Sequence, residues 1–360
     1  MKNILCYIDE LGPGGAERQI TSLAALLRKS GYPVKVYCYH PNYFYEDYLV
    51  CNDVELIKVE LKKNDYINKI RNTCSVISKY NFDTIISYSE GPNVIASLIK
   101  VFRPSLNVIV SERNTTQCLT LKEKLRFFLY RFVDSIVANS FSQTNFIKGT
   151  YPKLQNKTFT ITNYIDTTKF HPAEINITDS KVKFIVVARH SAQKNVPRFI
   201  EAINLLKNKN LPFYVDWYGD DGGGCKQEHV ELSEKYGLNN YLQFHPSASN
   251  IQDYYRKADV FCLPSLYEGF PNVLCEAMSS GLPVICSDVC DNPTLIENNV
   301  NGLLFNPKDP QSIAKAIESI VGMSSEQRRT IGRRNRVKAE HIFSEATFVN
   351  SYIKLIEWPR

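Results

Sequence analysis

Two glutamates lie in the segment PSLYEGFPNVLCEAM, residues 264–278. Glu268 follows an apolar run and precedes a Gly-Phe-Pro turn. Glu276 lies one turn into a helix that is expected to begin at Asn272. A carboxylate accepts hydrogen bonds from sugar hydroxyls, and a helix N-terminus attracts phosphate. The flanking strand and helix are apolar enough to be buried, so both acids need partners; a solvated surface pair is the alternative.

A second loop carries two cations, in the segment ARHSAQKN, residues 188–195. Arg189 and Lys194 follow an apolar β-branched run and precede another expected helix. Two positive charges beside the free N–H groups of a helix N-terminus suit a diphosphate whose negative charge grows as it departs. The alternative interpretation is a surface loop with solvated cations.

A glycine-rich loop, GPGGAERQI, occupies residues 12–20. Gly14 and Gly15 would let backbone N–H groups approach an anion, and a helix beginning near Ala16 would add its positive end. The loop is not G-x-G-x-x-G, and no acid ends the next expected strand, so a nicotinamide dinucleotide is not expected. A plain strand-to-helix turn is the alternative.

Glu112 and Arg113 lie at the end of a further expected strand, in the segment SERN, residues 111–114. This position makes them candidates for contacts with a second substrate, and a buried structural ion pair is the alternative. The chain has no C-x-x-C pair, no H-E-x-x-H motif and no D-x-D feature placed for metal binding. Neither a metal nor another cofactor is therefore expected.

These loops need a scaffold, and the chain alternates short apolar strands with amphipathic helices from end to end. This rhythm predicts an α/β fold with parallel sheets covered by helices on both faces. In the first half the expected strands are Ile4–Ile8, Val34–Tyr39, Thr84–Ser87, Asn107–Ser111 and Ser135–Ala138, and the expected helices are Glu17–Ser30, Tyr66–Tyr80, Asn93–Val101 and Leu121–Phe132.

The rhythm pauses near Asn163–Pro172 and then restarts. The expected strands of the second half are Phe184–Ala188, Tyr214–Tyr218, Leu242–Phe244, Val260–Leu263 and Pro283–Cys286, and the expected helices are Val196–Lys207, Gln227–Tyr236, Ile251–Lys257, Asn272–Ser279 and Pro310–Val321. We therefore predict two Rossmann-like, doubly wound domains that face a cleft. They are expected at residues 1–165 and 166–340, with a C-terminal helix in 341–360 that packs back on the first domain.

Length and composition agree with this organisation. The chain has 360 residues, of which 44% are hydrophobic and 22% charged, so disorder is excluded as its main state. Apolar stretches fall short of the ~18 residues of a spanning helix. The N-terminus MKNILCYIDE does not resemble a secretory signal, so a cytoplasmic protein is expected.

Charge is concentrated in the first half, where residues 1–170 hold 22 Lys and Arg against 15 Asp and Glu. This half is expected either to meet something anionic or to present a solvated basic surface. The segment LKEKLRFFLYRF, residues 121–132, is basic, aromatic and helix-patterned. It could lie peripherally on the anionic inner face of the cytoplasmic membrane, or it could be an ordinary helix with Phe and Leu facing the sheet. Nothing resembles a nucleic-acid readout motif, so no nucleic-acid partner is expected.

Taken together, four segments resemble the retaining glycosyltransferases of family 4: GGAERQI, ITNYIDTTKFHP, ARHSAQKN and PSLYEGFPNVLCEAMSSGLPVICSD. The SERN segment resembles the bacterial polysaccharide and lipid-linked-oligosaccharide transferases of that family. The resemblance covers nearly the whole chain. It implies the GT-B fold, in which two Rossmann-like domains hold a nucleotide-sugar in the cleft between them.

The implied reaction is transfer of a hexosyl or N-acetylhexosaminyl group (EC 2.4), with retention at the anomeric carbon and without a divalent metal. The donor would be a UDP- or GDP-sugar. The acceptor would be a glycan or lipid-linked glycan in surface polysaccharide, O-antigen, capsule or lipid-linked oligosaccharide assembly. The alternative is a catalytically inactive nucleotide-sugar-binding partner of a glycosyltransferase.

The resemblance also implies roles for individual residues. Glu268 would bind hydroxyls of the donor sugar, Arg189 and Lys194 would stabilise the diphosphate, and Glu276 would hold the ribose. Glu112 and Arg113 would contact the acceptor, or the donor. The remaining donor-binding positions would act through main-chain amides: Gly14, Gly15, Gly269, Phe270, Asn272 and Val273.

Overall fold

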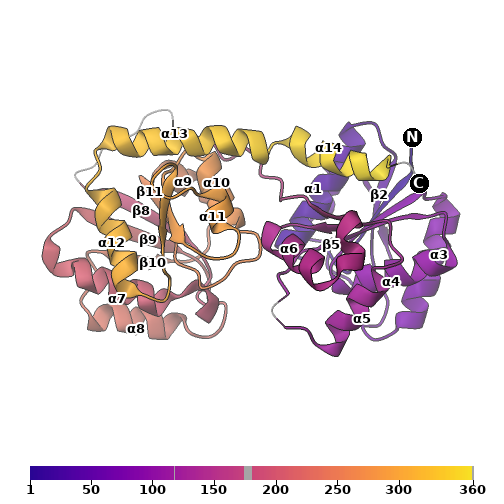
Figure 1. Cartoon of the computed structure of the whole chain (residues 1–360), viewed down its shortest axis with the longest axis horizontal. Coiled ribbons are helices and arrows are strands. Elements are labelled where there is room, and N and C mark those ends of the chain that lie inside the picture. Colours follow the sequence, from indigo (N-terminus) through magenta and orange to yellow (C-terminus); the bar gives the residue numbers. More distant parts are fainter. Residues whose placement is uncertain (117, 174–180, 359–360) are drawn as a thin grey trace. The chain divides into compact units, whose positions relative to one another are not determined.

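The structure is a computed structural model of the whole chain, and it describes residues 1–116, 118–173 and 181–358. The chain divides into two compact units. Unit 1 comprises Met1–Tyr164 and Glu345–Arg360, and unit 2 comprises Ile165–Ser344. Unit 1 therefore takes its last helix, α14 (Glu345–Ile356), from the far end of the chain; in Figure 1 this yellow helix lies among indigo and magenta elements.

Unit 1 is built on a parallel sheet. Its strands are β1 (Ile4–Tyr7), β2 (Val34–Cys38), β3 (Glu55–Lys58), β4 (Thr84–Tyr88), β5 (Asn107–Glu112), β6 (Ser135–Ala138) and β7 (Thr158–Thr160). Their order in the sheet is β3-β2-β1-β4-β5-β6-β7, and Ile4 of β1 pairs with Val34 on one side and Thr84 on the other. The order reverses at β1, so the loops after β1 and β4 flank the crevice where such sheets bind ligands.

Both faces of this sheet are buried, as the near-continuous apolar strands predict. Side chains of β1 alternate between two apolar clusters: Ile4 and Cys6 join one, and Leu5 and Tyr7 join the other. One face is covered by α1 (Gly15–Lys29), α2 (Glu46–Cys51) and α14. The other is covered by α3 (Tyr66–Tyr80), α4 (Glu90–Phe102), α5 (Leu121–Leu129) and α6 (Phe141–Thr150), and the 3-10 turn η1 (Pro152–Lys157) leads into β7.

Unit 2 repeats the plan with a second parallel sheet. Its strands are β8 (Val182–Val187), β9 (Phe213–Tyr218), β10 (Leu242–His245), β11 (Val260–Leu263), β12 (Val284–Ser287) and β13 (Gly302–Phe305). The order is β10-β9-β8-β11-β12-β13, so the direction reverses between β8 and β11. The loops after these two strands flank the ligand crevice of this sheet.

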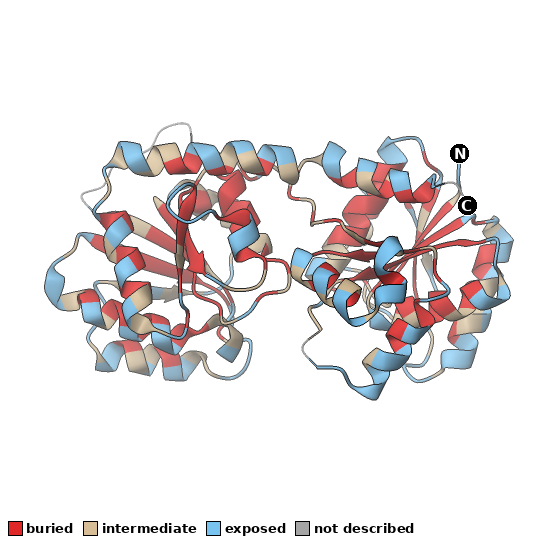
Figure 2. Cartoon of the chain, viewed as in Figure 1, coloured by how far each residue is buried: buried red, intermediate tan, exposed pale blue. Residues whose placement is uncertain are grey.

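Helices cover both faces of the second sheet as well. One face carries α7 (Val196–Leu206), α8 (Lys226–Lys235) and α12 (Pro310–Val321), and the other carries α9 (Ile251–Arg256), α10 (Asn272–Ser279) and α11 (Asn292–Leu295). The long helix α13 (Ser325–Ile342) places Ile331 in the first apolar cluster and Ala339 in the second. Two 3-10 turns, η2 (Ala192–Lys194) and η3 (Lys207–Lys209), flank α7. In Figure 2 the strands of each unit are mostly red, and the helices are red on the side toward them.

The predicted fold class is confirmed: each unit is a doubly wound α/β structure. The helix Tyr66–Tyr80 and the strand Val260–Leu263 are found with the predicted bounds. The pattern did not predict α2, β3, α6, β7, α11, β13 and α13. Of these, β3 is an edge strand with half-exposed Glu and Lys, and α13 is largely charged, so neither carries a strong apolar periodicity.

Helix α13 supports α10 through a close backbone approach. A Cβ on Gly332 of α13 would lie 2.0 Å from the carbonyl oxygen of Gly281, which follows α10. Only glycine permits this contact without a shift of backbone. The position of α10, which carries Glu276, therefore depends on a glycine in a different helix.

We predict that Gly332→Ala destabilises unit 2 by about 1–3 kcal/mol through overpacking, although alanine favours a helix by about 1 kcal/mol. Gly149→Ala is the matched control, because a Cβ on this helical glycine meets no atom within 4 Å. The control should be neutral or stabilising. Urea unfolding followed by circular dichroism measures both, and an unchanged midpoint for Gly332→Ala would contradict the packing argument.

Candidate functional site

The loops after β8 and β11 are joined at the crevice of unit 2. The backbone N–H of Leu266 donates to the carbonyl of Gln193 at 2.8 Å, and the Gln193 amide donates to the carbonyl of Tyr267 at 2.8 Å. Between these loops, Lys194 Nζ lies 2.6 Å from Glu268 Oε1, with the side chains only 14% and 8% exposed. The structure thus brings together two predicted site residues from separate segments of the chain.

Asn195 explains why the basic loop holds its position. Its backbone is left-handed, with φ of 60°, a conformation that asparagine tolerates better than most residues. Its side-chain amide donates to the carbonyls of Pro264 at 3.1 Å and Pro307 at 2.7 Å. One buried asparagine therefore connects the loops that follow β8, β11 and β13.

Cys290 and Ser265 lie near Glu268 in the structure. Neither belongs to a recognisable sequence motif, and neither was predicted as a site residue. The Cys290 sulfur accepts a hydrogen bond from the Glu268 backbone N–H at 3.4 Å. Ser265 is fully buried, and the described residues offer its hydroxyl no hydrogen-bond partner. A buried hydroxyl without a partner is unusual, so Ser265 is a polar group available at the base of this loop.

Glu276 lies on α10 and is 4% exposed. The Tyr255 hydroxyl lies 3.4 Å from Glu276 Oε2 and 3.2 Å from the carbonyl oxygen of Val273. Asn272 and Val273 form the first turn of α10, whose N-terminus no described side chain caps. The Asn272 backbone N–H donates to the carbonyl of Phe270 at 3.0 Å, so the turn itself uses this predicted main-chain donor.

Gly269 and Phe270 connect the Glu268 loop to α10. Phe270 is buried and packs edge-on against Phe343, with ring centroids 6.2 Å apart. The aromatic ring therefore anchors the turn, and any contact with a ligand falls to its main chain.

Arg189 differs from Lys194 in its surroundings. Its side chain is exposed, and it makes no ion pair with a described residue. The backbone next to Arg189 is fixed by a buried hydrogen bond, in which the Trp217 indole N–H donates to the carbonyl of Ala188 at 2.7 Å. Gly219 packs against the same carbonyl so closely that a Cβ there would lie 1.9 Å from the oxygen.

A pair of buried histidines lies beside this loop. The Nδ1 atoms of His190 and His229 are 3.0 Å apart, so one imidazole donates to the other. His190 is fully buried and packs near the ring of Phe244 at 5.0 Å. Burial, and then the neighbouring His229 and Lys226, lower the pKa of His190 to about 4. The pair is therefore neutral at physiological pH.

Unit 1 has a cavity of about 280 Å³ at the carboxyl ends of β1, β4 and β5. The N-termini of α1 and α4 border it. Gly14, with an extended backbone, is the N-cap residue of α1, and Ser89 is the N-cap residue of α4. Ser89 has φ of 75° and ψ of 154°, a strained conformation for a residue with a side chain. The lining residues are Gly15, Ala16, Glu17, Ser89, Glu90, Asn93, Ser111, Glu112, Arg113 and Asn114.

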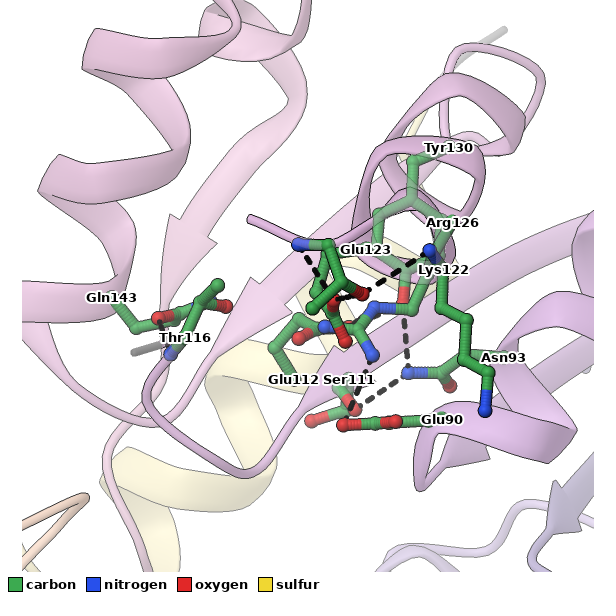
Figure 3. Close-up of polar contacts among 11 residues, drawn as sticks. Glu90, Asn93, Ser111, Glu112, Thr116, Lys122, Glu123, Arg126, Tyr130 and Gln143 are labelled. Atoms are coloured by element: carbon green, nitrogen blue, oxygen red, sulfur yellow. Dashed lines mark hydrogen bonds and ion pairs between the residues drawn. The ribbon is translucent and has the colours of Figure 1, made fainter. Parts of the chain in front are cut away.

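Glu112 is buried at the edge of this cavity, within the network drawn in Figure 3. Arg126 of α5 lies between two acids, with Nε 3.3 Å from Glu112 and a terminal nitrogen 3.0 Å from Glu90. The Tyr130 hydroxyl donates to Glu112 and accepts from Asn93 at 3.1 Å. Burial raises the pKa of Glu112, and Arg126 and Tyr130 oppose that rise.

The alternative prediction is a buried structural ion pair for Glu112 and Arg113. Glu112 does form a buried ion pair, but its partner is Arg126 and not Arg113. The Arg113 guanidinium instead lies 4.6 Å from the ring centroid of Tyr88 and donates to Asn163. Glu112 is the last residue of β5 and Arg113 is the first residue after it, and their side chains have different partners. Arg126 lies on a different element, and no local spacing links it to Glu112.

The segment 121–132 has one face buried in unit 1 and one exposed apolar face, and its membrane role stays a prediction. Phe127 and Leu129 are buried against unit 1. The opposite face of α5 exposes Leu121 by 84%, Leu125 by 59% and Phe128 by 51%, and Phe132, which follows the helix, is 41% exposed. We call these four residues the α5 stripe; they recur at helical spacing, and the exposed cations Lys122, Lys124 and Arg131 surround them.

Within residues 1–116, 118–173 and 181–358, no three His, Cys, Asp or Glu side chains cluster as a metal site would require. In the same ranges, no helix combines the length and apolar character needed to cross a bilayer.

Two family models match the chain. Residues 167–338 match glycosyl transferases group 1, and residues 13–169 match glycosyltransferase family 4. The amylovoran biosynthesis glycosyltransferase AmsD of Erwinia amylovora is 24% identical over 310 residues, covering 82% of this chain and 84% of that protein. Several other curated relatives match over less of their length, and this chain spans only 27–49% of them.

A Campylobacter jejuni protein is 24% identical over 309 residues, which cover 80% of this chain and 81% of that protein. Its name is N-acetylgalactosamine-N,N'-diacetylbacillosaminyl-diphospho-undecaprenol 4-alpha-N-acetylgalactosaminyltransferase. Among solved structures, Anabaena HepE in complex with UDP superposes with a TM-score of 0.87 at 18% identity, covering 98% of this chain and 99% of that one. This likeness shows a shared fold.

The histidine pair generates a pH prediction. Between the ordinary pKa of 6.5 and about 4, the unfolded chain binds a proton at His190 that the native protein does not. The unfolding free energy should therefore fall as the pH falls through this window, by about 2–3 kcal/mol at full extent.

The comparison protein is the His190→Asn variant, which should lose much of this acid dependence. Urea unfolding at pH 7 and pH 4.5 measures the unfolding free energy of both proteins. Both carry Trp358→Phe, so that Trp217 is the only tryptophan and reports unfolding by its fluorescence. Equal acid sensitivity in both proteins would show that His190 is not the titrating group.

Proposed function

Since this chain belongs to the family 4 glycosyltransferases, we propose that it transfers a sugar from a nucleotide-sugar to a glycan acceptor. The observation that carries the proposal is the contact between Lys194 and Glu268 at the crevice of unit 2. It places a cation that suits phosphate beside a carboxylate that suits sugar hydroxyls, which is the combination a nucleotide-sugar requires.

In this proposal the donor binds at the carboxyl edge of the unit 2 sheet. Glu276, on the buried α10, accepts hydrogen bonds from the ribose, and Glu268 accepts them from the sugar. The exposed Arg189 and the main-chain amide of Val273, in the first turn of α10, bind the diphosphate. A uridine nucleotide is the first candidate, because the related fold of HepE has been solved with UDP-glucose; GDP-sugars are the alternative.

The chemical step we propose is transfer with retention at the anomeric carbon. The bond from that carbon to the diphosphate breaks as the acceptor hydroxyl attacks the same face, and the departing diphosphate takes the hydroxyl proton. Arg189 and Lys194 stabilise the charge that grows on the leaving group, so the reaction needs no divalent metal. In unit 1, Gly15 brings a main-chain N–H group to the N-terminus of α1, where an anion is favoured, whereas the Gly14 N–H donates to the carbonyl of Gly12 at 2.8 Å.

We assign the acceptor to unit 1. Its cavity has a volume of about 280 Å³ and is lined by hydroxyl, amide, carboxylate and guanidinium groups, which suit a hydroxyl-rich saccharide. Glu112 and Arg113 are the proposed acceptor contacts. A glycan carried on a lipid diphosphate is the favoured form, as in the name of the Campylobacter relative.

A lipid-linked acceptor would bring unit 1 to the cytoplasmic face of the membrane. The α5 stripe provides exposed apolar side chains, and Lys122, Lys124 and Arg131 provide attraction to anionic lipid. An aliphatic and aromatic surface surrounded by cations fits this interface better than it fits bulk water.

The direct test is a panel of UDP- and GDP-sugars, screened by thermal shift and then assayed for slow donor hydrolysis without an acceptor. Stabilisation by one nucleotide family together with hydrolysis supports the proposal. Binding without any turnover, with or without lipid-linked glycan acceptors, would instead favour an inactive nucleotide-sugar-binding partner.

Glu276→Ala should weaken nucleotide binding about 10- to 100-fold, because the ribose loses a charge-assisted hydrogen bond of about 1.5–3 kcal/mol. Glu276→Gln retains one acceptor and should lose less. Isothermal titration calorimetry with UDP and GDP measures the effect, and the exposed Glu201→Ala on α7 is the control. Undiminished affinity in Glu276→Ala would assign Glu276 a structural role.

The paired substitution Leu125→Ser and Phe128→Ser should abolish salt-sensitive flotation with liposomes of anionic phospholipid. Ile67→Ser and Val337→Ser are matched controls, because these residues are 66% and 67% exposed but lie outside the α5 stripe. Absence of binding by the unmodified protein at low salt would remove the membrane from the proposal.

A further inference from the structure

The two cations of the basic loop are not equivalent. Arg189 is exposed and forms no ion pair within the described part of the chain, whereas Lys194 is already neutralised by Glu268 at 2.6 Å. Both members of that pair are largely removed from water, at 14% and 8% exposure. A charge in such a place interacts strongly with its partner, and loss of the partner is expensive.

A ligand at either residue therefore changes the environment of the other. A diphosphate that draws the Lys194 ammonium toward itself weakens the compensation of the Glu268 carboxylate. Sugar hydroxyls that donate to Glu268 restore that compensation and leave Lys194 available for phosphate. Occupancy of one position thus lowers the free energy of occupying the second, which is a reciprocal coupling.

The surrounding backbone prevents the pair from relaxing in another way. Gln193 fixes the two loops to each other, and Asn195 fixes both to the loop after β13. The Glu268 backbone N–H is held by Cys290. Glu268 therefore stays at a buried position when its cation is drawn away, and the penalty is retained instead of being relieved by movement of a loop.

We propose that the Lys194–Glu268 pair is a specificity device: it makes unit 2 bind an intact nucleotide-sugar in preference to the free nucleoside diphosphate. This inference rests on the proposed function and adds a role beyond it. Before transfer, the sugar and the diphosphate of one donor satisfy both residues together. After transfer the sugar no longer occupies Glu268, so Lys194 returns to the carboxylate and the hold on the diphosphate weakens, which assists product release.

The test compares affinities for UDP and UDP-glucose, and for GDP and GDP-mannose, by calorimetry on the full chain. Glu268→Gln removes the competing charge while conserving the shape of the side chain. It should bind the nucleoside diphosphate at least about 5-fold more tightly than the unmodified protein. The same variant should bind the nucleotide-sugar more weakly, so the preference for the intact donor collapses.

Lys194→Met removes the other charge of the pair. It provides a second test if the Glu268→Gln variant does not fold. It should also lose the preference for the intact donor, although it weakens binding of both ligands. In the double variant, the second substitution should add little to the loss of preference, because a single coupling has been removed. Glu201→Gln, on the exposed surface of α7, is the charge-matched control and should keep the preference.

Two results would overturn the inference in distinguishable ways. Nucleotides that bind the unmodified protein and the Glu268→Gln variant with the same affinity would remove the coupling and leave the proposed function intact. Failure of every UDP and GDP ligand to bind the unmodified protein would overturn the proposed function and, with it, the coupling.

Discussion

A carboxylate removed from water must be compensated, and both units meet this requirement at the carboxyl edge of their sheets. In unit 2 the compensating group is Lys194, from the loop of the neighbouring strand, and in unit 1 it is Arg126, from α5. Glu268 follows β11 and Glu112 ends β5, and both strands lie close to the point where the order of strands reverses. The same topology thus produces, twice, a polar group that is buried but lies where a ligand can reach it.

The ion pair between Lys194 and Glu268 also shows that burial, and not the number of charges, distinguishes the two cations of this site. Arg189 and Lys194 look alike in the sequence, since both are cations before a helix N-terminus. In the structure one is exposed and the other is held by an acid. Asn195 and the close approach of Gly219 to Ala188 determine this difference, because they fix the backbone from which both side chains project.

The sequence alone could predict the strands that are buried on both faces, and therefore the fold and the loops that carry Lys194 and Glu268. It could not predict β3, whose half-exposed Glu and Lys break the apolar pattern, or the charged α13. It also could not predict the Arg126 contact with Glu112, because that contact joins a helix to a strand with no local spacing between them. Contacts of this kind depend on tertiary packing, which periodicity does not encode.

The last helix of unit 1 has a consequence for the order in which the protein acquires its shape during synthesis. Helix α14 supplies Phe348, Val349 and Tyr352 to the core of unit 1, and the Tyr352 hydroxyl lies 2.7 Å from that of Tyr88. Unit 2 is continuous in the chain, whereas unit 1 is split around it. On the ribosome, the later-made half can therefore complete its core first, while the earlier-made half exposes an apolar face until translation reaches α14.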